Sequence, residues 1–166
     1  MDKEKKFEEI YKKYSREIYN YLLFLSCTRE EAEDILQDIF VKFWKMFDTL
    51  VGIQNLRAYL FRMARNRFID IKRKRKRFVE TEINEEIFDF HTEDISEKIR
   101  KKEFVKKLLS VLNEEEREII TLRFYENMKF REISEVTGLN ENTIRVKYMR
   151  ILEKLRKLIY NNTYEK

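Results

Sequence analysis

The sequence contains no proline and only two glycines, Gly52 and Gly138, in 166 residues. Proline and glycine build most tight turns, so their scarcity argues against a fold with many reversals of the chain. Helices joined by a few loops need far fewer such residues. We therefore predict an all-α fold.

Residues that bind metals or form disulfides are equally scarce. Cys27 is the only cysteine and His91 the only histidine. One thiol excludes an intramolecular disulfide, and one imidazole leaves no histidine cluster for a metal, so we expect no metal and no cofactor. Cys27 lies in an apolar stretch and is expected to be a small core residue. The absence of a signal peptide and of a membrane-length apolar run predicts a soluble, cytoplasmic protein with no membrane insertion.

Charge is abundant and strongly segregated along the chain. Residues 1–77 carry 19 basic and 12 acidic side chains, and residues 98–166 carry 17 basic and 11 acidic ones. Residues 78–97 carry eight acidic side chains and no Lys or Arg. We therefore predict two small helical domains that face nucleic acid, 1–77 and 98–166, joined by an acidic linker at 78–97.

Residues 129–157 predict a helix-turn-helix, a motif that commonly reads DNA. Gly138 can end the first helix in the left-handed conformation, and Asn140 can cap the second. Helical spacing then gives the second helix one apolar stripe, formed by Ile144, Tyr148, Ile151, Leu152 and Leu155.

The other side of this second helix carries the residues of a major-groove reader, which are Asn142, Arg145, Val146, Lys147, Met149 and Arg150. Arginine pairs bidentately with guanine, and small apolar groups pack on the thymine methyl. An amphipathic helix pair with merely solvated arginines is the alternative. The motif alone leaves both interpretations open.

Three helices are predicted before the linker, over residues 7–25, 30–47 and 55–77, with a loop at 48–54. Helical spacing gives the first an apolar stripe formed by Phe7, Ile10, Tyr11, Tyr14, Ile18 and Leu22. The third is expected to pack inward with Leu56, Tyr59, Leu60, Met63, Ala64 and Phe68. Thr28 is the expected N-cap of the second helix, with Glu31 as its capping-box partner. That helix has an exposed polar face formed by Asp34, Gln37 and Asp38, although acids near a helix N-terminus are also favoured by the helix dipole alone.

The third helix is basic on its polar side. Its polar positions are Arg62, Arg65, Asn66 and Arg67, and it runs into six consecutive basic residues that begin with Lys72, Arg73, Lys74 and Arg75. Because the run continues a basic helix, it favours a track for nucleic-acid phosphates over a solvated tail. Beyond the linker, helices are predicted from residue 99 and, with Asn113 as N-cap and Glu116 as its capping-box partner, from residue 114.

The order of these pieces resembles a sigma-70 family RNA polymerase sigma factor of the small extracytoplasmic-function (ECF) group. EAEDILQDIFVKFW resembles the region 2.1–2.2 helix of that family, and NLRAYLFRMARNRFIDIKRKRKR resembles its regions 2.3–2.4. LNEEEREIITLRFYENMKFREISEVTGLNENTIRVKYMRILEKL resembles region 4. The resemblance implies a protein that is not an enzyme and that directs core polymerase to promoters.

The resemblance also implies roles for single residues. Asp34, Gln37 and Asp38 match the face that binds the clamp helices of the largest polymerase subunit. Asn66 matches the asparagine beside the pocket for a flipped base of the −10 element, with residues 48–55 as the specificity loop. The cationic side chains expected to contact −10 DNA are Arg62, Arg65, Arg67, Lys72, Arg73, Lys74 and Arg75.

Further partners follow from the same resemblance. The outward face of the last helix matches the residues that read the −35 element, although the serine-like residue common in the family is replaced by Val146. Residues 114–125 match the surface that grips the polymerase flap, and an anti-sigma factor is the expected inhibitor. We further expect a compact free state in which the acidic linker competes with DNA for the basic faces.

The principal alternative is a stand-alone helix-turn-helix regulator that binds DNA without polymerase. A nuclease that holds magnesium with Asp34 and Asp38 is a second alternative, but no third acid, histidine or glycine-rich phosphate loop accompanies these two residues. A helical scaffold leaves the segregation of charge unexplained.

Overall fold

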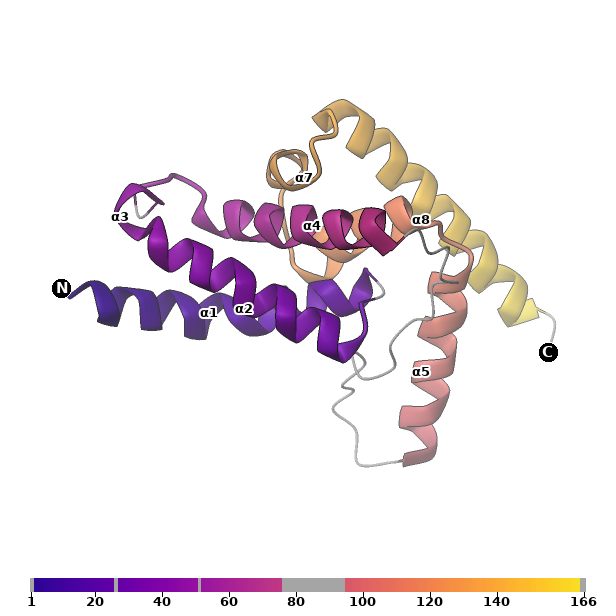
Figure 1. Ribbon diagram of the computed structural model, residues 1–166. Coiled ribbons are helices and arrows are strands. Elements are labelled where there is room, and N and C mark those ends of the chain that lie inside the picture. Colours follow the sequence, from indigo (N-terminus) through magenta and orange to yellow (C-terminus); the bar gives the residue numbers. More distant parts are fainter. Residues whose placement is uncertain (1, 26, 51, 76–94, 165–166) are drawn as a thin grey trace.

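The computed structural model describes residues 2–25, 27–50, 52–75 and 95–164, and the regular structure within them is entirely helical. The all-α prediction is confirmed for this part of the chain. Helices α1 to α4 form what we call the N-terminal lobe, and helices α5 to α8 form the C-terminal lobe (Figure 1). No helix among the described residues is long and apolar enough to cross a membrane.

The N-terminal lobe consists of α1 (Lys3–Phe24), α2 (Arg29–Lys45), α3 (Phe47–Leu50) and α4 (Leu56–Arg75). The predicted capping box starts α2: the Glu31 backbone N–H donates to Thr28 Oγ1 at 3.2 Å, and the Thr28 N–H donates to the Glu31 carboxylate at 3.0 Å. The loop predicted at 48–54 is wrong at its start, because α3 reaches into it. Phe47 and Leu50 stand one turn apart and are both buried, so a helical turn covers more apolar surface than a loop.

The C-terminal lobe consists of α5 (Ile95–Ser110), α6 (Glu114–Ile120), the π-helical turn η2 (Thr121–Tyr125), α7 (Phe130–Thr137) and α8 (Glu141–Tyr164). The capping box predicted at Asn113 and Glu116 is present, with bonds of 2.9 and 3.0 Å. Most of the predicted linker, residues 78–94, lies outside the described residues, and α5 begins at Ile95. The domain boundaries stay a prediction.

The predicted helix-turn-helix is confirmed in α7 and α8. Gly138 follows α7 in the left-handed conformation, with φ of 75°. The side-chain oxygen of Asn140 then accepts a bond of 2.9 Å from the Asn142 backbone N–H, which caps α8. Ile144 and Ile151 are fully buried on the inner face of α8, as the apolar stripe predicts.

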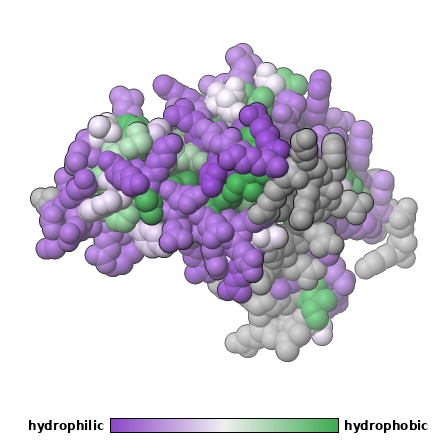
Figure 2. All heavy atoms as spheres, viewed as in Figure 1, coloured by the Kyte–Doolittle hydropathy of each residue, from purple (hydrophilic) through white to green (hydrophobic). Residues whose placement is uncertain are grey.

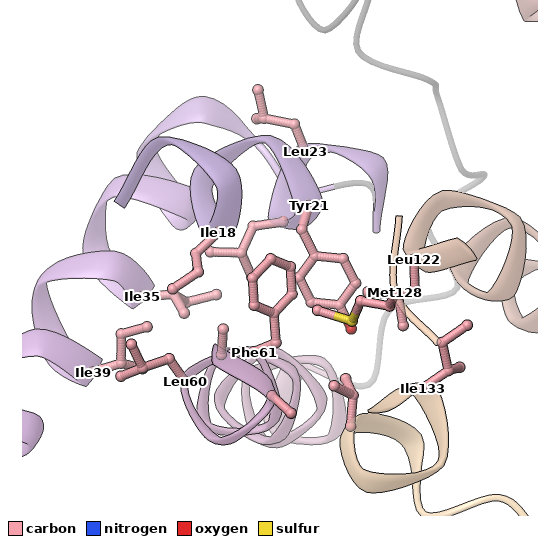
Figure 3. Close-up of a cluster of buried hydrophobic side chains, with 14 of the residues drawn as sticks. Ile18, Tyr21, Leu23, Ile35, Ile39, Leu60, Phe61, Leu122, Met128 and Ile133 are labelled. Carbon is pink, nitrogen blue, oxygen red and sulfur yellow. The ribbon is translucent and has the colours of Figure 1, made fainter. Parts of the chain in front are cut away.

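The two lobes share one apolar core. Tyr21 of α1 and Phe61 of α4 lie with their ring centroids 5.1 Å apart (Figure 3). Leu122, Met128 and Ile133 of the C-terminal lobe approach them from the other side, and all five side chains are fully buried. Neither Tyr21 nor Phe61 belongs to the stripes predicted for the first and third helices. Their burial follows from the packing of one lobe on the other.

The glycine turn gives a stability prediction. Replacing Gly138 with alanine forces a Cβ into a left-handed conformation, so we expect a loss of about 1 kcal/mol in the free energy of unfolding. An added Cβ meets no atom within 4 Å there, so the cost is conformational rather than a clash. Chemical denaturation followed by circular dichroism measures it.

Gly52→Ala is the matched control. A Cβ added at Gly52 also meets no atom within 4 Å, and the backbone φ of Gly52 is not positive. The substitution should be neutral or slightly stabilising, because alanine restricts the unfolded chain. Equal losses at the two glycines would contradict this explanation of the turn.

Candidate functional site

The outward face of α8 presents apolar side chains to solvent between two arginines. Val146 is 50% exposed and Met149 is 64% exposed. Both line a shallow surface groove together with Arg145 and Arg150. Guanidinium donors can supply hydrogen bonds to base edges in the major groove, and the exposed apolar groups between them can pack on the thymine methyl.

The remaining side chains of this face differ in orientation. Arg145 is held in place by its own lobe, with a bond of 2.7 Å to the Glu141 carboxylate and its guanidinium 5.0 Å from the centre of the Phe130 ring. Lys147 turns away from the groove and pairs with Glu115 of α6. Asn142 is exposed in the first turn of α8. The structure therefore brings four of the six predicted residues into one groove.

The basic side chains of α4 point in three directions. Arg62 and Asn66 stand one turn apart and are exposed, with the Arg62 guanidinium 5.2 Å from the centre of the Tyr59 ring. Arg67 turns toward α2 and pairs with Asp38 at 2.9 Å.

The third direction is toward the C-terminal lobe. Arg65 donates to the Glu118 carboxylate at 2.7 Å, and Lys72 donates to that of Glu114 at 2.5 Å. Although burial opposes it, the Glu118 carboxylate raises the pKa of Arg65, which therefore stays charged. Arg73 and Lys74 are exposed at the end of α4, and the side chain of Arg75 lies outside the described part of the chain.

The polar face predicted on α2 is exposed as expected: Asp34, Gln37 and Asp38 all face solvent. Beside Gln37 an apolar groove runs between α1 and α2, and it is lined by Phe7, Tyr11, Leu36, Phe40, Val41 and Trp44. Exposed apolar surface of this kind, rimmed by polar residues, is typical of a site for another protein.

The sequence pattern did not predict this groove. It placed Tyr11 in the buried stripe of α1, whereas the Tyr11 side chain is 42% exposed. The available signal was the aromatic content of the two facing stretches, since Phe7, Tyr11, Phe40 and Trp44 all line the groove. Figure 2 shows by contrast that the visible face of the molecule is mostly hydrophilic, with apolar groups confined to small patches.

A metal site is not evident in the part of the chain that the structure describes, where no three His, Cys, Asp or Glu side chains gather to hold an ion. The two acids considered for magnesium are not equivalent, because Asp38 is engaged by Arg67.

Comparison with known proteins decides between the interpretations. The family description Sigma-70 region 2 matches residues 10–78, and Sigma-70, region 4 matches residues 105–155. The chain belongs to the sigma-70 family. This sigma factor falls in the ECF group, and its family consists of transcription initiation factors rather than enzymes.

Individual relatives match over nearly the whole chain. The ECF RNA polymerase sigma factor SigM of Bacillus subtilis (strain 168) is 27% identical over 156 residues, which cover 93% of this chain and 94% of SigM. The RNA polymerase sigma factor YlaC of the same organism is 27% identical, with 79% of each chain covered. The sigma factor RpoE from Bartonella quintana, solved in complex with the anti-sigma factor NepR, superposes with a TM-score of 0.73 at 25% identity and covers 94% of this chain and 98% of its own.

The two faces of α8 should respond differently to truncation. We expect Ile144→Ala and Ile151→Ala each to lower the free energy of unfolding by about 2–5 kcal/mol, because each leaves a cavity in a packed core. Val146→Ala and Met149→Ala should stay within about 0.5 kcal/mol of the parent, because their side chains are exposed. Urea denaturation of the four variants measures this. A large loss at Met149 would show that it serves the fold rather than a ligand.

Proposed function

We propose that this sigma factor binds core RNA polymerase through its N-terminal lobe and reads promoter DNA with both lobes, the −10 element with α4 and the −35 element with α8. The observation that carries the proposal is the outward face of α8, where Val146 and Met149 are exposed to solvent between Arg145 and Arg150. The stability of the fold does not account for this arrangement, whereas recognition of base edges does.

The proposed docking surface for polymerase combines the polar face of α2 with the neighbouring apolar groove. Asp34 and Gln37 supply exposed polar groups, and Trp44 and Val41 supply the apolar contact that usually carries binding energy. An acidic rim beside an aromatic groove suits a basic, amphipathic partner. The clamp helices of the largest polymerase subunit are the partner that the family resemblance implies.

A second polymerase contact is proposed on η2, for the flap. Phe124 is 79% exposed, more than any other large apolar side chain among the described residues. Tyr125 beside it is half exposed. Such aromatic side chains are suitable anchors for a protein partner.

For the −10 element, we propose that Asn66 and Arg62 contact an unstacked base from one exposed face of α4. Recognition of a flipped base needs polar groups on a rigid element together with cations that hold the backbone. Arg73 and Lys74 are exposed farther along the same helix, and we propose that they and Arg75 contact phosphates. Three further cations, Arg65, Arg67 and Lys72, are paired with carboxylates in this structure. We propose that they contact DNA phosphates only when those ion pairs break.

Two further elements of the proposal rest on the relatives. An anti-sigma factor is proposed as inhibitor, since the Bartonella quintana factor was solved with one. The cytoplasm is proposed as location, because polymerase and promoter DNA are there. A stand-alone regulator is not favoured by the comparisons, since both matched regions are those of sigma factors.

Reversing the charge of the α2 face tests the docking surface. The double substitution Asp34→Lys and Asp38→Lys should weaken binding to core polymerase by at least tenfold, because it places two positive charges against a basic partner. Affinity is measured by fluorescence anisotropy of the labelled sigma factor. Helical content should not change, since both side chains are exposed.

Two charge reversals elsewhere provide the matched control. Glu9→Lys with Glu103→Lys changes the net charge equally at exposed positions of α1 and α5. Full core affinity is expected for this control. Equal affinity of both double variants would remove the basis for the docking surface.

Base readout by α8 is tested separately. Arg145→Ala and Arg150→Ala should each cost about 1–3 kcal/mol on the preferred promoter and relax the preference at one −35 position. Neutralising Arg73 and Lys74 should weaken all promoters alike and reduce the salt dependence. The measurement is transcription by the reconstituted holoenzyme from a randomised −35 library. A uniform loss over the whole library for Arg145→Ala would show that this side chain does not read bases.

A further inference from the structure

The two arginines of the α8 groove are held in different ways. The Arg145 guanidinium donates to the Glu141 carboxylate at 2.7 Å and lies 5.0 Å from the centre of the Phe130 ring. Arg150 lines the same groove but has neither an ion pair nor an aromatic contact among the residues that the structure describes. The groove thus contains one guanidinium that is restrained on two sides and one that is free to turn.

The Phe130 ring is itself fixed by the fold. It lies edge-on to the Tyr148 ring of α8, with the two centroids 5.4 Å apart. The Arg123 guanidinium of η2 lies 4.9 Å from the centre of the same ring, and it donates to the Met128 backbone carbonyl at 2.9 Å. Phe130 belongs to α7 and Arg145 to α8, so one helix of the helix-turn-helix provides a surface for an arginine of the other (Figure 1).

The pair of Glu141 and Arg145 contributes little to the fold. Glu141 precedes Arg145 by one turn of α8, and the two side chains are 39% and 54% exposed. Exposed pairs of this spacing add little stability, and an acid in the first turn of a helix is favoured by the dipole in any case. The contacts of Arg145 therefore mainly restrict where its guanidinium can point.

Such a restriction matters for reading bases. Arginine reads guanine through two parallel hydrogen bonds, which require one orientation of the guanidinium plane. A pre-oriented side chain loses less rotamer freedom on binding than a mobile one. A mobile arginine can also pair with DNA phosphates, which carry no sequence information. Glu141 occupies only one nitrogen, Nη2, so other N–H donors of Arg145 remain available for a base.

We propose that Phe130 and Glu141 are positioning residues for recognition of the −35 element, which act through Arg145 and not through Arg150. The inference rests on the proposed function, because it uses the −35 role of α8. Phe130 needs no contact with DNA in this role. Discrimination at the base position that Arg145 reads depends on the ring and the carboxylate, whereas discrimination at the Arg150 position does not.

The ring is tested by transcription from a randomised −35 library with the reconstituted holoenzyme. Arg145→Ala and Arg150→Ala first identify the position that each arginine reads. Phe130→Leu keeps an apolar side chain and removes the ring. We expect it to lower the preference at the Arg145 position by about two- to fivefold, the factor that a cation–π contact at an exposed site supplies. The preference at the Arg150 position should not change, and Phe130→Tyr, which keeps the ring, should retain both.

A double variant separates positioning from a general structural role. If the ring acts through Arg145, adding Phe130→Leu to Arg145→Ala should leave the −35 preference as it is in Arg145→Ala alone. Relaxation at both arginine positions, or a further change in the double variant, would show that Phe130 shapes the whole motif and would overturn the positioning role. An unchanged preference in Phe130→Leu would overturn it as well. If Arg145→Ala has no effect at any position, the proposed base readout has itself failed, so the two failures are distinguishable.

Glu141→Gln tests the carboxylate, because it keeps the side-chain length and removes the charge. We expect the preference at the Arg145 position to relax and transcription from non-preferred sequences to rise, since the freed guanidinium can pair with phosphates. Glu153→Gln is the matched control: Glu153 is another exposed acid of α8, paired at 3.3 Å with Lys157 one turn later. It should leave the preference at every position unchanged. Equal selectivity of the two glutamine variants at the Arg145 position would overturn the role of Glu141.

Discussion

The carboxylate of Glu118 is the interaction on which the arrangement of the lobes depends. It is buried, and a buried charge is tolerated only where charged or polar partners replace water. Its partners are Tyr21 and Arg65, which come from two helices of the other lobe. Either lobe alone would lack part of this hydrogen-bonded group, because one lobe supplies the acceptor and the other supplies both donors. These polar contacts thus fix the relative placement of the two lobes, which apolar contact alone would orient less specifically.

Side chains that look alike in the sequence face different surroundings in the structure. Arg62, Arg65 and Arg67 lie within six residues of α4, yet one is exposed, one is directed to the opposite lobe and one is paired with α2. A helix rotates each successive residue by about 100°, so a short basic stretch faces several partners. Treating such a stretch as one uniform basic patch overlooks that its members already have different partners.

Local patterns predicted the helices well. Thr28 with Glu31, Asn113 with Glu116, and Gly138 are signals read over three or four residues, and the structure contains each of them. The four outward residues of α8 follow in the same way from the helical period. What could not be predicted depends on partners far along the chain. Tyr21 is buried by side chains about one hundred positions away, and the acceptor for Arg65 lies 53 positions away. A single sequence gives no signal for such pairs.

The shared core couples the lobes in folding. Because Tyr21 and Phe61 are covered by Leu122 and Met128, neither lobe reaches its full burial until both have formed. In this arrangement, heat should unfold the two lobes in one cooperative transition rather than two. Anything that parts the lobes, whether a partner protein or DNA, exposes this apolar surface and has to cover it again or leave each lobe with a smaller core. The molecule thus keeps part of its stability in the contact between its two lobes rather than inside either of them.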